Sequence, residues 1–214
     1  MYDLLCPGCG HRTAMNIIDK IITDMNIKKN VIFAHDVACC SLLTDYVYYD
    51  GIMCPHGRVI PVSIGIKSAR YENFVLSYMG DGAAYEIGFN ELIHAASRKD
   101  DICAVVINNG ILAMTGGQKT STNLSYQNFK IENIFKSFNV NFMARAILSD
   151  KKNIDIAEEF LREEFNTYMK KGGFNIVELI SPCPTNYKKS INECVDILNT
   201  VVKDRYGIFK ETNS

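Results

Sequence analysis

Apolar residues along this chain fall alternately in short continuous runs and at helical spacing. The continuous runs predict strands at residues 30–36, 74–79, 102–109, 141–147 and 174–180. The helical spacing predicts helices within residues 14–25, 56–71, 83–99, 131–138, 156–169 and 192–206. In the helix at 83–99, the side chains expected to face inward are Ile87, Leu92, Ile93 and Ala96. Alternating strands and helices predict an α/β fold, with a largely parallel sheet covered by helices on both faces.

Length and charge narrow the picture further. With 214 residues, 47% of them hydrophobic, we expect one domain over 1–214, ending in a loose polar tail at 207–214. The net charge of -1 gives no electrostatic case for binding nucleic acid or an anionic membrane. No apolar stretch approaches the roughly 20 residues of a membrane helix, and the first residues lack the features of a signal peptide. We therefore expect a cytoplasmic protein.

Two polar motifs each close an apolar strand. Gly80-Asp81-Gly82 follows the strand at 74–79, and the next strand ends in Asn108-Asn109. In a parallel sheet, ligands bind at the carboxyl ends of the strands. The glycines would permit a tight turn, and the helix that follows would favour an anion such as a diphosphate. Asp81 and Asn109 offer the oxygen ligands that Mg²⁺ prefers. Each motif alone is also typical of an ordinary turn.

The chain has eight cysteines, which in a reducing compartment favour metal binding or catalysis over a disulfide framework. Cys103 and Cys194 lie in apolar patterns and are expected in the core. The CPGC motif of Cys6 and Cys9 is compatible with a redox dithiol, half of a zinc site or part of an iron–sulfur cluster. Its spacing alone favours zinc and iron–sulfur equally.

Several segments together resemble one family. The GDG and NN motifs resemble the thiamine diphosphate motif, and the segments CPGCGH, HGRVIPVSIGIK, NNGILAMTGGQ and SPCPTN resemble beta subunits of 2-oxoacid:ferredoxin oxidoreductases. These segments extend from Cys6 to Asn186, most of the chain. The resemblance implies a thiamine diphosphate-binding fold, of which this chain would form the diphosphate-binding domain. It also implies coenzyme A-dependent oxidative decarboxylation of a 2-oxoacid, with electrons passed to ferredoxin.

The resemblance also implies site residues. The Mg²⁺ ligands would be Asp81, Asn109 and the backbone carbonyl of Ile111. The cofactor would be contacted by Gly80, Asp81, Gly82, Ala83, Asn109, Ile111, Met114, Thr115 and Gly116. His56 and Arg58, in the HGR turn, would be polar or acid–base groups near the cofactor, although a lone histidine is more often structural.

The same resemblance implies a role for the cysteine motifs. It implies a 4Fe–4S cluster on Cys6, Cys9, Cys39 and Cys183, with Cys40 as an alternative to Cys39. Four thiolates suit such a cluster, and a four-thiolate zinc site has the same spacing. His11 is expected to pack against or polarise the cluster and the cofactor loop.

The implied partners complete the prediction. Thiamine diphosphate needs a glutamate from a pyrimidine-binding domain, which we expect from an alpha subunit because Glu86 and Glu91 lie on the diphosphate side. Gamma and ferredoxin-like delta subunits are further candidate partners. Gly116 stands where relatives that prefer 2-oxoglutarate can carry a lysine, so a branched-chain 2-oxoacid is favoured. The alternatives are a non-redox thiamine diphosphate decarboxylase subunit and a zinc-stabilised interaction module.

Overall fold

The computed structural model describes residues 4–43, 47–123, 129–202 and 206–211. A sheet of seven strands forms its centre, in the spatial order β2-β1-β3-β4-β8-β7-β9. The strands are β1 (Val31–Asp36), β2 (Asp50–Cys54), β3 (Phe74–Gly80), β4 (Ile102–Asn108), β7 (Phe142–Ile147), β8 (Phe174–Ile180) and β9 (Gly207–Glu211). Neighbouring strands are parallel, except that β9 is antiparallel to β7. The predicted α/β class and largely parallel sheet are confirmed.

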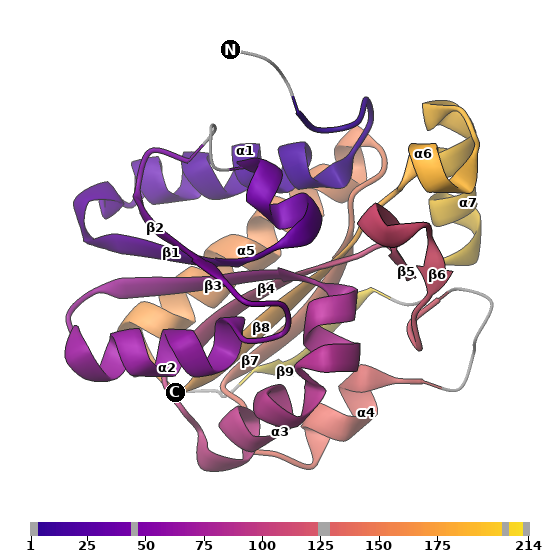
Figure 1. Ribbon diagram of the computed structural model, residues 1–214. Coiled ribbons are helices and arrows are strands. Elements are labelled where there is room, and N and C mark those ends of the chain that lie inside the picture. Colours follow the sequence, from indigo (N-terminus) through magenta and orange to yellow (C-terminus); the bar gives the residue numbers. More distant parts are fainter. Residues whose placement is uncertain (1–3, 44–46, 124–128, 203–205, 212–214) are drawn as a thin grey trace.

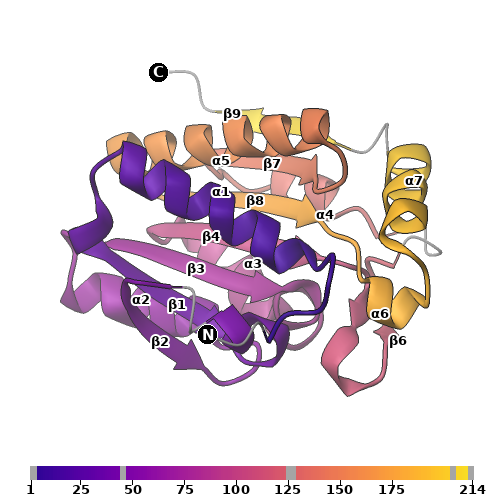
Figure 2. The ribbon, with the colours of Figure 1, turned by 90° about the horizontal axis from the view of Figure 1, so that it is seen from above.

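Helices cover both faces of the sheet (Figures 1 and 2). They are α1 (Gly10–Asp24), α2 (Val59–Ala69), α3 (Phe89–Arg98), α4 (Ile131–Lys136), α5 (Lys151–Lys171), α6 (Pro184–Tyr187) and α7 (Ile191–Val201). Helices α1 and α5 lie on one face, and α2, α3 and α4 lie on the other. Among the described residues, no helix is long and apolar enough to cross a membrane.

Strand residues alternate between two hydrophobic cores, one on each face. On β4, Cys103 and Val105 pack with α1 and α5, whereas Ala104 and Val106 pack with α2 and α3. A continuous apolar run suits such a strand because both of its faces are buried. The expectation that Cys103 and Cys194 are buried is confirmed.

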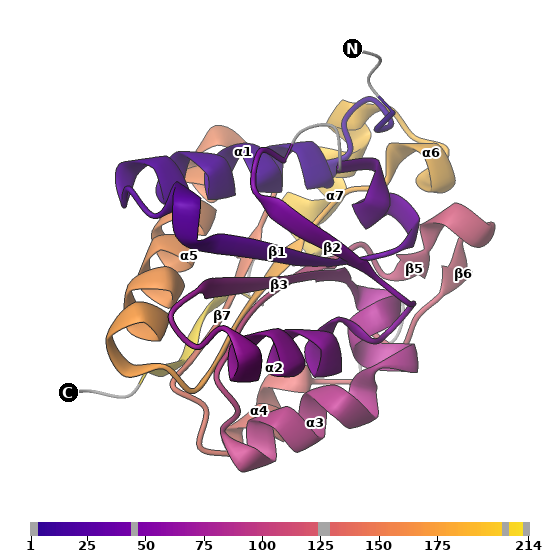
Figure 3. The same cartoon turned by 60° about the vertical axis from the view of Figure 1, so that its left-hand side comes forward.

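Shorter elements complete the chain and were not predicted. They are the 3₁₀ turns η1 (Lys28–Asn30), η2 (Ala38–Leu43) and η4 (Ala113–Thr115), the π-helix η3 (Gly82–Ile87), and the two-stranded ladder of β5 (Ile111–Leu112) and β6 (Gln118–Lys119). Strand β2 was also missed; it lies at the edge of the sheet beside β1 (Figure 3). Several of these elements follow the carboxyl ends of β1, β3 and β4, where the candidate site forms.

The helix predicted at 83–99 is divided in two. Its first turns form the π-helix η3, in which the backbone N–H of Gly88 donates to the carbonyl of Ala83 at 2.9 Å. A π turn holds an extra residue, which rotates Ile87 off the apolar face. The prediction that Ile87 faces inward is therefore wrong: its side chain is 46% exposed, whereas Leu92 and Ala96 are buried as expected.

The C-terminal segment also differs from expectation. The last helix ends at Val201, earlier than the predicted 206, and 203–205 lie outside the described residues. The tail predicted to be loose at 207–214 instead forms β9 over Gly207–Glu211, paired with β7. Phe209 explains the correction, because its ring packs against the core and lies 5.2 Å from the Arg145 guanidinium. Residues 212–214 lie outside the description.

Candidate functional site

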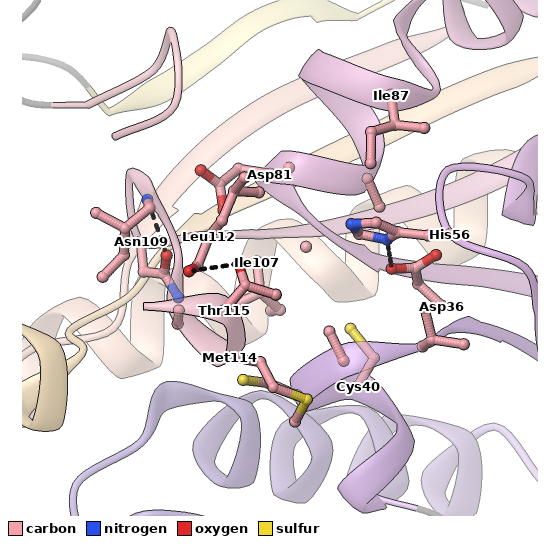
Figure 4. A pocket seen from close by; sticks show the side chains of 18 of the residues that line it. Asp36, Cys40, His56, Asp81, Ile87, Ile107, Asn109, Leu112, Met114 and Thr115 are labelled. Carbon is pink, nitrogen blue, oxygen red and sulfur yellow. Dashed lines mark hydrogen bonds and ion pairs between the residues drawn. The ribbon is translucent and has the colours of Figure 1, made fainter. Parts of the chain in front are cut away.

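A pocket of about 300 Å³ opens at the carboxyl ends of β1, β2, β3 and β4 (Figure 4). The chain reverses its order across the sheet between β1 and β3, which is where open α/β sheets bind their ligands. Of the residues expected to contact the cofactor, the pocket lining includes Gly80, Asp81, Gly82, Ala83, Asn109, Ile111, Met114 and Thr115. The lining does not include Gly116, which follows at the end of η4.

Asp81 and Asn109 lie on the same side of this pocket. They follow neighbouring parallel strands, in which Gly80 is paired with Ile107, so their side chains converge as the sequence predicted. Asn109 Oδ1 accepts a hydrogen bond from the backbone N–H of Ile111 at 3.1 Å. An almost fully buried carboxylate, an amide oxygen and the Ile111 carbonyl form a donor set that suits Mg²⁺.

The environment of Asp81 was not predicted in detail. Its Oδ2 accepts hydrogen bonds from Thr120 Oγ1 at 2.6 Å and from Thr122 Oγ1 at 3.3 Å. Burial raises the pKa of Asp81 to about 6, although the two threonine hydroxyls lower it. A divalent cation at this carboxylate would favour its ionised form. The site therefore suits an Asp81 carboxylate bound to a metal ion better than an ionised Asp81 carboxylate without a cation.

The predicted tight turn at Gly80-Asp81-Gly82 takes another form. Asp81 has helical dihedral angles, with φ -60° and ψ -38°, so β3 passes directly into η3. At position 82, a Cβ would come 2.1 Å from Leu112 Cδ2, the end of a flexible side chain that would have to move aside. Gly110 has a φ of +72°, and a Cβ there would come 2.9 Å from the Asn123 Cα. The turn that needs glycine for its backbone conformation thus follows Asn109 rather than Asp81.

His56 lines the same pocket, on the side away from Asp81 (Figure 4). Its Nδ1 lies 2.6 Å from Asp36 Oδ2, and Asp36 Oδ1 accepts from the backbone N–H of Gly57 at 3.0 Å. Burial raises the pKa of Asp36, an effect that its contacts with His56 and Gly57 partly offset. Sequence reasoning missed Asp36; its place at the end of β1 was the available signal. Paired with a carboxylate, the His56 ring is held in one orientation.

Arg58 does not reach the pocket lining. Its guanidinium pairs with Glu91 on α3 at 3.0 Å, and it also donates to the carbonyl of Gly57 at 3.3 Å. His11 does line the pocket, and its Nδ1 lies 2.8 Å from the Tyr78 hydroxyl. Burial lowers the pKa of His11 to about 4, so this imidazole is neutral at pH 7.

The four cysteines predicted as cluster ligands share one region. Burial, with smaller contributions from the charges of Cys39, Cys183 and Cys6, raises the pKa of Cys9 to about 11. The CPGC loop packs on the segment that carries Cys183, since a Cβ on Gly8 would come within 3.3 Å of Pro184. Within the described residues, however, no group of three or more His, Cys, Asp or Glu is arranged to hold a metal ion. The cluster therefore stays a prediction.

Cys39 and Cys40 have different surroundings. Burial has the largest effect in raising the pKa of Cys39, followed by the charges of Cys183 and Cys6. Cys40 is fully buried. Burial has the largest effect in raising the pKa of its thiol, and the charge of Asp36 has the next largest. This difference favours Cys39 over Cys40 as the third cluster ligand.

The Cys183 segment also braces the loop after Asn109. Asn186 Nδ2 donates to the carbonyl of Ala113 at 3.0 Å and to Cys183 Sγ at 3.5 Å. The Tyr187 hydroxyl donates to the carbonyl of Asn109 at 2.5 Å. The thiol region and the diphosphate side of the pocket are thus joined through one short helix, α6.

Comparison with known proteins identifies the class. Residues 31–179 match the family described as thiamine pyrophosphate enzyme, C-terminal TPP binding domain. The 2-oxoglutarate synthase subunit KorB of Methanocaldococcus jannaschii is 34% identical over 193 residues, covering 86% of this chain and 70% of KorB. The ketoisovalerate oxidoreductase subunit VorA of Methanothermobacter thermautotrophicus is 29% identical over 203 residues, covering 86% of this chain and 42% of VorA.

A solved structure supports the fold. The 2-oxoglutarate:ferredoxin oxidoreductase from Magnetococcus marinus, with 2-oxoglutarate, coenzyme A and succinyl-CoA bound, superposes with a TM-score of 0.78 at 19% identity. That match covers 100% of this chain and 83% of the other. The chain belongs to the beta subunits of 2-oxoacid:ferredoxin oxidoreductases, within the thiamine pyrophosphate enzymes.

Proposed function

We propose that this chain binds thiamine diphosphate and Mg²⁺ as the beta subunit of an enzyme that oxidatively decarboxylates a 2-oxoacid and forms acyl-coenzyme A. The observation that carries the proposal is the convergence of Asp81 and Asn109 in one pocket, at the ends of neighbouring strands. Asp81, Asn109 and the Ile111 carbonyl would hold the metal. When bound, thiamine diphosphate would supply a nucleophilic carbon for the keto group of the 2-oxoacid and a thiazolium ring able to accept the electron pair left when CO₂ departs.

The chain's own residues would position the substrate and move protons. Asp36 holds His56 by its Nδ1, so the other ring nitrogen is available for proton transfer in the pocket. Leu112, Met114 and Ile87 would exclude water around the reacting centre. Cys6, Cys9, Cys39 and Cys183 would hold a 4Fe–4S cluster, which would carry electrons towards ferredoxin.

The activating glutamate would come from an alpha subunit. Among the described residues, no glutamate lines the pocket. Glu86 accepts hydrogen bonds from the backbone and side chain of Ser121, and Glu91 pairs with Arg58. The chain purified alone, with saturating cofactor, substrate and acceptor, should therefore give no turnover. Robust activity from the isolated chain would contradict the need for a partner.

A branched-chain 2-oxoacid is the substrate that the pocket favours. Its described lining contains apolar side chains of Ile87, Leu112 and Met114, and no lysine or arginine. A dicarboxylate needs a cation for its far carboxylate. With the complete complex, kcat/KM should be at least about tenfold higher for 2-oxoisovalerate than for 2-oxoglutarate, the range that apolar pockets give. The reverse order would overturn the substrate assignment and leave the rest of the proposal standing.

The decisive experiment is metal and sulfide analysis of the complex purified without oxygen, together with its absorption spectrum. Iron, sulfide and a brown colour would support the redox enzyme. A colourless complex that binds thiamine diphosphate would instead support a non-redox decarboxylase. A complex that contains zinc and binds no thiamine diphosphate would indicate an interaction module.

A further inference from the structure

A buried ion pair joins β8, the neighbour of β4, to β7 beyond it. Arg145 on β7 and Glu178 on β8 are register partners, both are buried, and Arg145 Nε donates to Glu178 Oε2. Arg145 Nη2 also donates to Glu132 on α4 at 2.9 Å. A buried ion pair adds little net stability compared with apolar side chains of the same size. Its presence is therefore better explained by the polar groups that it orients.

The ion pair fixes the orientation of Asn108. Glu178 Oε1 accepts a hydrogen bond from Asn108 Nδ2 at 2.7 Å. An ionised carboxylate can only accept hydrogen bonds, so the amide nitrogen of Asn108 must face Glu178. Its amide oxygen consequently faces the loop, where it accepts from the backbone N–H of Gly110 at 2.9 Å. Asn108 thus holds the turn that follows Asn109.

The same amide oxygen reaches the neighbours of Asp81. Thr122 Oγ1 lies 3.0 Å from Asn108 Oδ1, 3.3 Å from Asp81 Oδ2 and 3.0 Å from Thr120 Oγ1. The backbone N–H of Thr120 donates to the carbonyl of Gly110 at 3.1 Å. A continuous series of polar contacts therefore runs from the ion pair to the Asp81 carboxylate and to the backbone of the turn that follows Asn109.

We propose that Asn108 and Thr122 are positioning residues that hold the Asp81 carboxylate and the Asn109 turn ready for Mg²⁺, with the Arg145–Glu178 pair fixing the amide of Asn108. The inference rests on the proposed function, because it assumes that Asp81 and Asn109 bind the metal. Residues that orient metal ligands through hydrogen bonds commonly contribute 10- to 100-fold to metal affinity, an order-of-magnitude range.

The test measures Mg²⁺ binding to the complete complex by isothermal titration calorimetry at saturating thiamine diphosphate. Asn108→Ala and Thr122→Val should each raise the dissociation constant of Mg²⁺ about 10- to 100-fold. Thr122→Ser keeps the hydroxyl and should bind Mg²⁺ like the unchanged protein. Should Asn108→Ala fail to fold, the nearly isosteric Thr122→Val still provides the test.

Ser63→Ala is the matched control. Ser63 and Ser77 are both buried, and their hydroxyls share a hydrogen bond of 2.7 Å. Loss of this hydrogen bond should lower the melting temperature of the metal-free complex about as much as the Asn108→Ala and Thr122→Val substitutions do. It should leave the Mg²⁺ dissociation constant within about twofold, because effects at distant sites are independent. Unchanged Mg²⁺ affinity in both Asn108→Ala and Thr122→Val would overturn the positioning role while the proposed function stands. If the unchanged complex itself bound no Mg²⁺ with thiamine diphosphate, the proposed function would fall too.

Discussion

Replacing Asp36 by asparagine should separate the orientation of His56 from the stability of the fold. Asparagine has nearly the shape of aspartate, so its Oδ1 can still accept from the Gly57 backbone. Its amide group, however, would donate towards His56 Nδ1 and stabilise the tautomer that carries its proton on the other ring nitrogen. Because burial raises the pKa of Asp36, the folded chain disfavours its charge, and neutral asparagine should cost little stability.

The expected size of the effect comes from the charged contact, which asparagine replaces by a neutral contact of reversed direction. The Asp36–His56 contact is 2.6 Å long with a carboxylate that is 1% exposed. A hydrogen bond to a charged group contributes about 1.5–3 kcal/mol, which corresponds to a loss of about 10- to 200-fold in kcat. The KM for the 2-oxoacid should change less than about threefold, because substrate binding does not depend on this proton.

Steady-state kinetics of the complete complex would measure both constants. Asp50→Asn is the matched control, since Asp50 is exposed on β2, where its backbone pairs with that of Ile32 on β1. Asp36→Asn should also add nothing further to His56→Gln, because the two side chains act as a unit. Full kcat in a folded Asp36→Asn complex would refute the acid–base role of this pair.

Three further predictions follow from single positions. Gly110→Ala should destabilise the protein by about 1–3 kcal/mol in urea unfolding, because alanine is strained at positive φ and its Cβ would meet Asn123; an unchanged midpoint would contradict the turn geometry. Cys39→Ser should lower iron and sulfide content while Cys40→Ser leaves both unchanged, and the opposite result would reassign the third cluster ligand. Burial raises the pKa of Glu164 well above 4.5, so the folded chain keeps a proton that the unfolded chain releases. The free energy of unfolding should therefore fall by up to about 1.4 kcal/mol per pH unit as pH rises above about 4.5, until the folded pKa is passed. Glu164→Gln should remove that slope in urea titrations at several pH values, whereas an equal slope in both proteins would show that another group titrates.

The parts of the site that sequence revealed are those on buried central strands. The runs ending at Gly80 and Asn108 are continuous and apolar, so the motifs after them could be placed at one edge of the sheet. Strand β2 was not predicted because four of its five residues are exposed, so its sequence shows neither an apolar run nor an alternation of apolar and polar residues. The role of Asp36 was also missed, because its partner His56 lies 20 residues away in the chain and contacts it only in the folded protein.

Periodicity also failed where the backbone departs from regular geometry. The helix pattern at 83–99 assumed 3.6 residues per turn, but η3 is a π-helix and Ile87 consequently lines the pocket. Phe209 lies in a strand too short for its pattern to be distinguished from a polar tail. The threonines at 120 and 122 lie in a loop with no apolar period, so nothing in the sequence connected them with Asp81.

The short helix α6 places a strict constraint on chain length in this part of the sequence. Cys183, Asn186 and Tyr187 lie within a little more than one helical turn, and the last two hold the loop after Asn109 through their side chains. Each helical residue turns the chain by about 100°. Inserting or deleting one residue between 183 and 186 would point the sulfur and the two loop-holding groups in incompatible directions. Surface connections elsewhere can lengthen or shorten among homologues, but this one is expected to keep a constant number of residues.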